Sequence, residues 1–213
     1  PAPPQLQRSC VRSRLESAAI ALNFDRMEDG VFLSGQMLIA MPGIGDPRFE
    51  RALVLICAHD DSHAMGIAVN RPVEGLTVPD LLGRLDVKST IEVPPDLVLL
   101  GGPVDRERGF VLHTDDYSSG DNSLPIREGV SLTATREVLE AMAGQNRPPR
   151  RSLLALGYAG WGAGQLEREI RENIWLTCDA DETLIFGADH ELKWTNALAK
   201  IGVFQSAGSI IFL

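Results

Sequence analysis

The sequence predicts an α/β protein, with a single domain in which helices flank a mixed β-sheet. Short apolar runs typical of strands alternate along the chain with amphipathic helical patterns. Several of these runs are joined by turns too short for a helical crossover, so those strands should pair antiparallel. The hydrophobic share of 44% over 213 residues is enough for a packed core.

Residues 1–30 are interpreted as an N-terminal extension, and residues 31–213 as the domain itself. The extension opens with Pro-Ala-Pro-Pro and then shows only a weak helical pattern. Met27 would make a sensible first residue for the domain. The extension therefore need not be native, although it could also pack as a helix.

The first half of the chain consists mostly of strands. Apolar runs predict five of them, at residues 36–41, 52–59, 64–70, 97–100 and 110–113. The second is apolar on both faces, which indicates an interior position. A polar turn, Asp60-Asp61-Ser62, separates the second from the third, so these two should pair antiparallel. Thr77 can cap a helix that continues to residue 85.

The second half of the chain mixes helices with short strands. Helical patterns lie within residues 131–145, 165–173 and 191–201. Strands are predicted at residues 152–156, 175–178 and 183–186, with a further terminal strand around Gly208-Ser209-Ile210. The stretch Arg147-Pro148-Pro149-Arg150 is expected to be a linker.

A glycine-rich segment follows the strand at residues 152–156. It contains four glycines and two aromatic residues between positions 157 and 165, and glycine loses the most chain entropy on folding. A loop that ends at a helix start presents backbone N–H groups that can hold an anion. The candidate ligand-binding residues here are Gly160, Trp161, Gly162, Gly164 and Gln165. In the alternative, the aromatic rings cover the edge of the core and the glycines only let the chain turn.

Known phosphate motifs do not match this segment. No Lys-Ser or Lys-Thr follows the last glycine, and the order of the glycines differs from the dinucleotide fingerprint. Two further residues, Arg108 and His113, follow the tight turn Gly101-Gly102-Pro103 and could border the same pocket. In the alternative, both residues only belong to the structure around this turn, and their charges are solvated.

Cys57-Ala58-His59 supplies the candidate catalytic residues. On a strand, residues two apart point to the same face, so the Cys57 thiol and the His59 imidazole should be neighbours. A protonated imidazole lowers the pKa of a thiol and can generate a nucleophile. The alternative is a buried core cysteine with a histidine at the end of its strand.

Composition argues against several classes of function. The formal net charge of −9 does not suit direct nucleic-acid binding, which needs clustered lysine and arginine. The cysteines, Cys10, Cys57 and Cys178, are widely spaced and suggest reduced thiols, and we expect neither a metal site nor a cofactor. No apolar run approaches the roughly 20 residues of a membrane helix, so we expect a cytoplasmic protein. The oligomeric state stays open.

A set of segments spread over the chain is distinctive. They are residues 33–42, Asp46-Pro47-Arg48-Phe49, Cys57-Ala58-His59, residues 65–72, Gly101-Gly102-Pro103-Val104, residues 108–113, the glycine-rich segment through Glu169, Asn173 and Trp175-Leu176. Together they resemble the AlgH/YqgE family of bacterial proteins, and the resemblance covers nearly all the chain after the extension. Where that family commonly has Pro-Ala-Asp, this chain has Asp179 before Ala180-Asp181, and the segment before Met27 has no counterpart.

The resemblance implies a single-domain α/β protein with a mixed sheet. Members of the family are often described as transcriptional regulators, and no established activity accompanies the name. The glycine turns and the missing catalytic signature favour a regulatory binding module for a small anion or a protein partner. The alternative is a thiol-dependent enzyme or redox sensor that uses Cys57 and His59.

Overall fold

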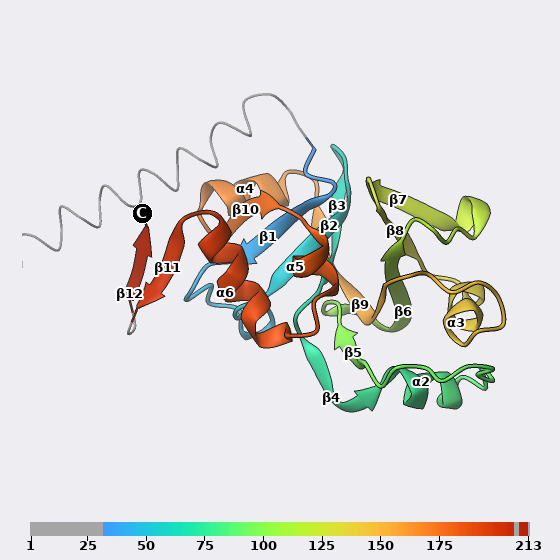
Figure 1. Cartoon of the computed structure of the whole chain (residues 1–213). Coiled ribbons are helices and arrows are strands. Elements are labelled where there is room, and N and C mark those ends of the chain that lie inside the picture. Colours follow the sequence, from blue (N-terminus) through green and yellow to red (C-terminus); the bar gives the residue numbers. More distant parts are fainter. Residues whose placement is uncertain (1–31, 207–208, 213) are drawn as a thin grey trace, which may run out of the picture.

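One long strand, β9 (Ser152–Gly162), organises the fold. Its second half pairs with β3 (His63–Ala68), and its first half pairs with β5 (Leu97–Leu100) and β6 (Val104–Thr114). The computed structural model describes residues 32–206 and 209–212. In this part of the chain, these strands belong to a ten-stranded sheet that runs through the middle of the molecule (Figure 1).

The sheet is mixed, as the sequence predicts. Its path runs β10-β1-β2-β3-β9-β6-β8-β7, while β4 pairs with β5 off this path. The β5–β9 pairing is parallel and the others are antiparallel. The remaining strands are β1 (Gln36–Ala40), β2 (Leu53–His59), β4 (Pro72–Thr77), β7 (Ser123–Arg127), β8 (Val130–Thr133) and β10 (Trp175–Asp179).

Helices cover both faces of this sheet and one end of it. They are α2 (Val78–Arg84), α3 (Arg136–Met142), α4 (Gln165–Arg171), α5 (Glu182–Phe186) and α6 (His190–Lys200). Two 3₁₀ turns, Pro47–Phe49 and Gly120–Asn122, and a small sheet of β11 (Val203–Ser206) with β12 (Ser209–Phe212) complete the described elements. Figure 1 shows α4, α5 and α6 around β1, β2 and β10, while α2 and α3 lie on the side of the molecule formed by β4 to β8.

Three apolar cores explain this arrangement. The first lies between one face of β1 and β2 and the helices α5 and α6, and it contains Leu55 and Trp194. The second lies on the opposite face, where α4 contributes Leu166 and Ile170. The third lies under α2 and α3 around Leu154 of β9. Alternate residues of a strand face opposite sides of the sheet, so a single strand can supply side chains to several cores.

Most of the predicted elements are confirmed. The strand at residues 97–100 has the predicted bounds, and the second and third strands form the predicted antiparallel pair. The helix predicted within residues 131–145 is α3, preceded by β8. The strands β4, β7, β8 and β11 were not predicted, and β6 begins six residues before the predicted run. The interpretation of residues 1–30 lies outside the described residues.

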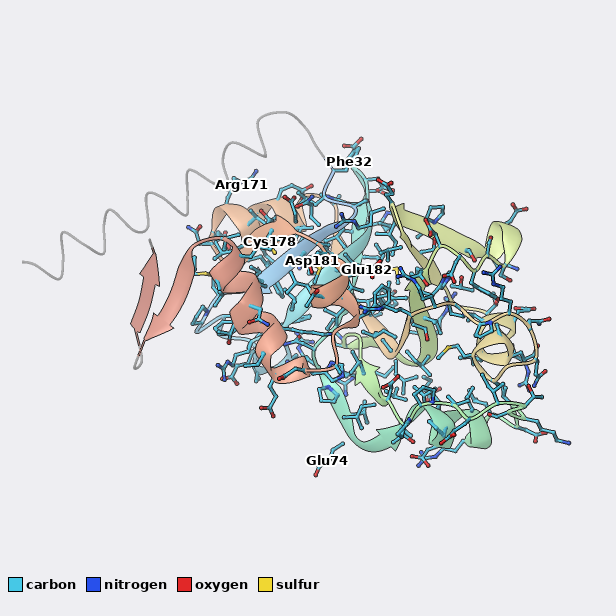
Figure 2. The ribbon with its side chains drawn as sticks, viewed as in Figure 1. Phe32, Glu74, Arg171, Cys178, Asp181 and Glu182 are labelled. Carbon is cyan, nitrogen blue, oxygen red and sulfur yellow. The ribbon has the colours of Figure 1, made fainter. Side chains whose placement is uncertain are left out.

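Two predictions of local structure are wrong. Residues 183–186 belong to a helix, α5, because Asp181 accepts a hydrogen bond from the Leu184 N–H and caps it. Asp181 and Glu182 lie together at its start (Figure 2). The glycine-rich segment is not a loop either, since β9 continues through it to Gly162. Among the described residues, no helix is long and apolar enough to cross a membrane.

Candidate functional site

A β-bulge in β2 separates the two candidate catalytic side chains. The pairing of β2 with β3 shifts register between Ile56 and Ala58, so Cys57 is an extra residue in its strand. An extra residue reverses the alternation of faces beyond it. Cys57 therefore packs in the core beneath α5 and α6, while His59 pairs with Ala64, which belongs to the core on the other face. The expected thiol–imidazole contact is absent for this reason.

The Cys57 thiol is enclosed by apolar side chains. The residue is 2% exposed, and its sulfur lies 3.5 Å from the Leu55 carbonyl oxygen. Burial raises the pKa of this thiol to about 12, because a thiolate would lose its hydration. Cys57 is thus held as a neutral thiol at physiological pH.

We expect Cys57 to resist thiol reagents while the protein is folded. At pH 8, labelling with a maleimide should be at least a hundredfold slower than in denaturant, since neither access nor thiolate is available. The comparison variant is Cys10→Ser with Cys178→Ser, which leaves Cys57 as the sole thiol. Rapid labelling of that variant in buffer would contradict the burial described above.

His59 connects the start of the described chain to α4. Its Nδ1 accepts a hydrogen bond from the Leu33 backbone N–H at 3.0 Å. The hydrogen-bond network therefore assigns the ring proton to Nε2, which donates to Glu167 Oε1 at 2.9 Å. The imidazole is only 4% exposed, and the Phe32 ring meets its edge at 5.4 Å between centroids. Both ring nitrogens are thus occupied by structural partners.

Two indoles converge on a single carboxylate behind the glycine-rich segment. Trp161 and Trp175 each donate from Nε1 to Glu169 Oε2, at 2.8 and 2.9 Å. The other carboxylate oxygen accepts from Gln165 Nε2 at 2.8 Å. Trp161 is 6% exposed, so its ring fastens α4 to the sheet.

The glycines of this segment also have structural roles in β9 and at the start of α4. Gly160 and Gly162 are paired in the β9–β3 ladder, opposite Met65 and His63. The Gly162 N–H also donates to Gln165 Oε1 at 3.1 Å, and Gly164, at φ +66°, turns the chain into α4. A ligand role for these residues remains a prediction that the geometry does not favour, because the Trp161 indole, the Gly162 N–H and the Gln165 amide already have side-chain partners.

His113 lies far from the glycine-rich segment. It pairs with Ser152 at the first residue of β9, and eight residues of strand at about 3.3 Å each separate Ser152 from Gly160. The predicted common pocket would have to span roughly 25 Å, so the structure does not bring these residues together.

His113 instead anchors a buried polar network. Its Nδ1 donates to the Thr114 carbonyl oxygen, and its Nε2 accepts from Thr133 Oγ1, at 2.9 and 2.8 Å. Ser123 continues the chain of hydrogen bonds to Thr133 at 2.8 Å. Burial lowers the pKa of His113, so the neutral imidazole is favoured. This network ties β6, β8 and β7 together.

Arg108 also lies apart from the predicted site. Its guanidinium sits over the Phe110 ring, 5.3 Å from the centroid. The residue borders a cavity of about 240 Å³ between α2 and α3, whose apolar lining includes Leu81 and Leu139.

Sequence analysis missed a different set of arginines, which line a groove of about 250 Å³. We call this feature the arginine groove. Its lining residues are Pro47, Arg48, Phe49, Ala68, Arg71, Leu100, Gly102, Pro103 and Arg106. They come from three separate stretches of the chain, and each stretch includes part of a segment that carries the resemblance described above. Those shared segments are the signal that could have found the groove.

The three arginines of the groove differ in how they are held. Arg48 makes a bidentate ion pair with Asp46, and this lowers the pKa of the Asp46 carboxyl. Arg71 donates through Nη1 to the carbonyl oxygens of Arg48 and Glu50, which are uncharged partners. Arg106 has no ion-pair partner within the described chain.

The charge of the groove is therefore positive, in a protein whose formal net charge is −9. A guanidinium carries five N–H donors in a planar fork that suits phosphate or carboxylate oxygens. Within residues 32–206 and 209–212, Arg71 bonds protein groups through one nitrogen, Nη1, and the Arg106 guanidinium bonds none. The groove can accept an anion, and Phe49 and Pro103 add apolar surface beside it.

Close packing of the backbone fixes one wall of the groove. A Cβ atom built on Gly102 would lie 2.0 Å from the Tyr158 carbonyl carbon, and one on Gly101 would lie 2.3 Å from the Gly157 carbonyl oxygen. Only glycine lets the chain cross β9 at this distance. The turn is thus a structural requirement, and it holds Pro103 and Arg106 in place. Over the described ranges, no group of three or more histidine, cysteine or acidic residues could hold a metal ion.

The sequence is similar to uncharacterised bacterial proteins along most of its length. A UPF0301 protein of Caulobacter vibrioides is 67% identical over 176 residues, covering 83% of this chain and 90% of that protein. A UPF0301 protein of Rhodopseudomonas palustris is 49% identical over 188 residues, covering 85% of this chain and 86% of that protein.

Solved structures show the same fold. The solution structure of the AlgH protein from Pseudomonas aeruginosa superposes with a TM-score of 0.69 at 35% identity, covering 84% of this chain and 97% of that one. The crystal structure of protein DIP2367 from Corynebacterium diphtheriae gives 0.65 at 18% identity, covering 82% and 88%, a likeness of fold alone. The AlgH-like family model matches residues 37–205. The chain therefore belongs to the AlgH-like family.

Proposed function

We propose that this protein is a regulatory binding module whose ligand is a small anion, bound in the arginine groove. The observation that carries the proposal is that Arg71 and Arg106 line one concave site and that neither has a carboxylate within ion-pair distance among the described residues. The Arg71 charge also acts on Asp46, whose carboxylate is already bound by Arg48, so the site keeps a positive charge. Unneutralised cations gathered in an acidic protein are complementary to an anionic ligand.

The lining of the groove suits an anion that carries an apolar group. Ligand pockets combine apolar walls with a few polar groups that fix orientation. Here Pro47, Phe49 and Pro103 supply apolar surface, and the guanidinium groups supply the donors. A phosphate or carboxylate carried on a small organic body fits this combination.

The two other functions considered have less support. Direct contact with nucleic acid would require an extended basic surface, which a net charge of −9 opposes. A thiol-dependent enzyme or redox sensor would require an accessible thiolate, and Cys57 is buried with its pKa raised to about 12. Action on a protein partner in response to the bound anion is compatible with the proposal.

Titration with inorganic phosphate and with pyrophosphate, followed by calorimetry, tests the anion site. We expect saturable binding, and we expect Arg106→Gln to weaken it about tenfold, since a charge-assisted hydrogen bond contributes about 1.5–3 kcal/mol. The Arg106 side chain makes no hydrogen bond or ion pair with other described residues, so its loss should leave thermal unfolding unchanged.

The matched control is Arg84→Gln, which removes the same charge from the last turn of α2, outside the groove. Equal weakening by both variants would mean that the anion responds only to net charge. Absence of saturable binding by both anions would reject the proposed function.

A further inference from the structure

Arg106 reaches the arginine groove from a long bulge in β6. In the pairing of β6 with β9, residues 105–108 stand opposite the single residue Gly157. Extra residues in one strand bend it and re-aim its side chains. Asp105 turns the chain at φ +49°, and a Cβ on Gly157 would lie 3.2 Å from the Arg106 Cα. The bulge is therefore packed closely on β9, which fixes the point from which the Arg106 side chain extends.

Arg71 is held by the main chain of a neighbouring segment. Its Nη1 donates to the carbonyl oxygens of Arg48 and Glu50. The adjacent Asn70 fastens the same segment, because its Nδ2 donates to the Arg51 carbonyl oxygen at 2.8 Å. Uncharged carbonyl groups orient a guanidinium and leave its charge in place. Arg71 is thus positioned before a ligand arrives, which lowers the entropic cost of binding.

Positive charge exceeds negative charge at the groove by two. Three guanidinium groups line it, and one carboxylate, Asp46, is bound to Arg48. The other acidic residues close to these arginines in sequence do not line the groove and make no ion pair within the described chain; they are Glu50, Asp105 and Glu107. A doubly charged anion complements this site better than a singly charged one.

Apolar groups form the rest of the lining. The Phe49 ring is fixed by an edge contact with Trp175, at 5.4 Å between centroids, and Pro47 and Pro103 add two rigid rings. The volume of about 250 Å³ is close to the lower end of the range for small-molecule pockets, about 300–1,000 Å³. The groove therefore suits one small organic group beside the charged head, rather than a length of polypeptide.

From these contacts we infer that the groove binds a phosphate monoester of a small aromatic or apolar compound. The phosphate lies between Arg71 and Arg106, and the organic group lies against Phe49 and Pro103. A phosphate monoester carries a charge of about −1.5 to −2 at pH 7 and three strong acceptor oxygens, whereas a carboxylate carries a single charge. This assignment rests on the function proposed above and narrows its ligand from anions in general to one class.

Phenyl phosphate and phenyl sulfate test the charge requirement, because they share a ring and a tetrahedral head group and differ by about one charge. In calorimetric titrations of the full chain at pH 7.5, phenyl phosphate should bind saturably and at least about tenfold more tightly than phenyl sulfate. It should also bind about threefold or more tightly than inorganic phosphate, which has no group to contact the apolar walls.

Arg106→Gln should weaken phenyl phosphate more than phenyl sulfate, so the preference between them should shrink. Arg84→Gln, the matched control in α2, should preserve that preference. A short acetylated and amidated peptide with one phosphotyrosine distinguishes a free compound from a modified protein, and it should bind no more tightly than phenyl phosphate. Binding of this peptide about tenfold more tightly would overturn the assignment to a small molecule.

The remaining outcomes separate this inference from the proposed function. Saturable binding of phenyl phosphate and phenyl sulfate with equal affinity would overturn the phosphate monoester and leave the anion site intact. Equal effects of Arg106→Gln and Arg84→Gln on the preference would also overturn it. If neither of these esters nor inorganic phosphate binds saturably, the anion site itself is rejected.

Discussion

Gly102→Ala should destabilise the protein by about 3 kcal/mol or more, because the new methyl group has no space. Its Cβ would lie 2.0, 2.2 and 2.3 Å from backbone atoms of Tyr158 and Ala159. Backbone atoms of a central strand cannot yield as a flexible side chain can, so the turn or β9 itself would have to move. Urea denaturation followed by circular dichroism measures the loss, and failure to fold would be the extreme form of the same result.

Gly83→Ala provides a control of opposite sign. Gly83 lies in α2, and nothing lies within 4 Å of the position its Cβ would take. Alanine is the better helix former, so this variant should gain roughly 0.5–1 kcal/mol. If Gly102→Ala were as stable as the wild type, the close approach of the turn to β9 would be wrong.

Stability should rise with pH above neutrality because of a lysine buried in α6. Lys193 is 2% exposed, and its Nζ donates to the carbonyl oxygens of Val69 and Ile185, both at 2.8 Å. Burial lowers the pKa of Lys193 from 10.5 to about 7. A neutral amine has two N–H donors, which matches the two carbonyl acceptors.

The sign of the effect follows from proton binding by the two states. Between about pH 7 and 10.5, the unfolded chain keeps the Lys193 proton while the folded protein has released it, so the free energy of unfolding increases with pH. From pH 7 to 8.5 we expect a rise of roughly 1.5 kcal/mol, at about 1.4 kcal/mol per pH unit once Lys193 is neutral in the folded state. The penalty for charging Lys193 is fully present below pH 7.

Denaturant titrations at pH 7, 7.75 and 8.5 measure this slope. Lys193→Met should abolish it, whereas Lys88→Met, at an exposed position, should preserve it. This pH range excludes the titration of Cys57. Its raised pKa makes the free energy of unfolding fall with pH, but only near and above 9.0, the pKa of the thiol in the unfolded chain. The range also avoids His190, whose pKa is lowered from 6.5. An equal slope in wild type and Lys193→Met would contradict the assignment.

Sequence patterns predicted this fold well where the information is local. The polar turn Asp60-Asp61-Ser62 between apolar runs is enough to predict the β2–β3 pair. The error at residues 183–186 arose because a short apolar run fits either a strand or a helix. The deciding signal, the capping residue Asp181, was present in the sequence.

The candidate site was predicted less well, because its geometry depends on partners distant in sequence. The same-face rule for Cys57 and His59 fails at the bulge, and a bulge depends on register with the neighbouring strand. The glycines of β9 suggested a loop. Gly157 has φ +71°, and its Cβ would lie 2.7 Å from the Val104 carbonyl oxygen, so close strand contact explains this glycine.

The arginine groove could not be predicted from local pattern for a similar reason. Arg48, Arg71 and Arg106 each stand beside turn residues with nothing unusual in their spacing. The pairing of β3, β5 and β6 with β9 brings the Arg71 and Arg106 segments together, and Arg71 bonds the carbonyl oxygen of Arg48 from a third segment. Chemistry that is assembled from several loops becomes visible once the topology is known.

The shared strand β9 also governs how the molecule comes apart. This strand contributes side chains to all three cores. Leu153 and Ala155 belong to the core beneath α5 and α6, and Leu154 belongs to the core beneath α2 and α3. Ala159 and Trp161 belong to the core beneath α4. Loosening any one of these regions releases a stretch of backbone on which the other two depend. Loss of structure is therefore cooperative across the whole domain, and neither side of the molecule can persist as an autonomous folding unit.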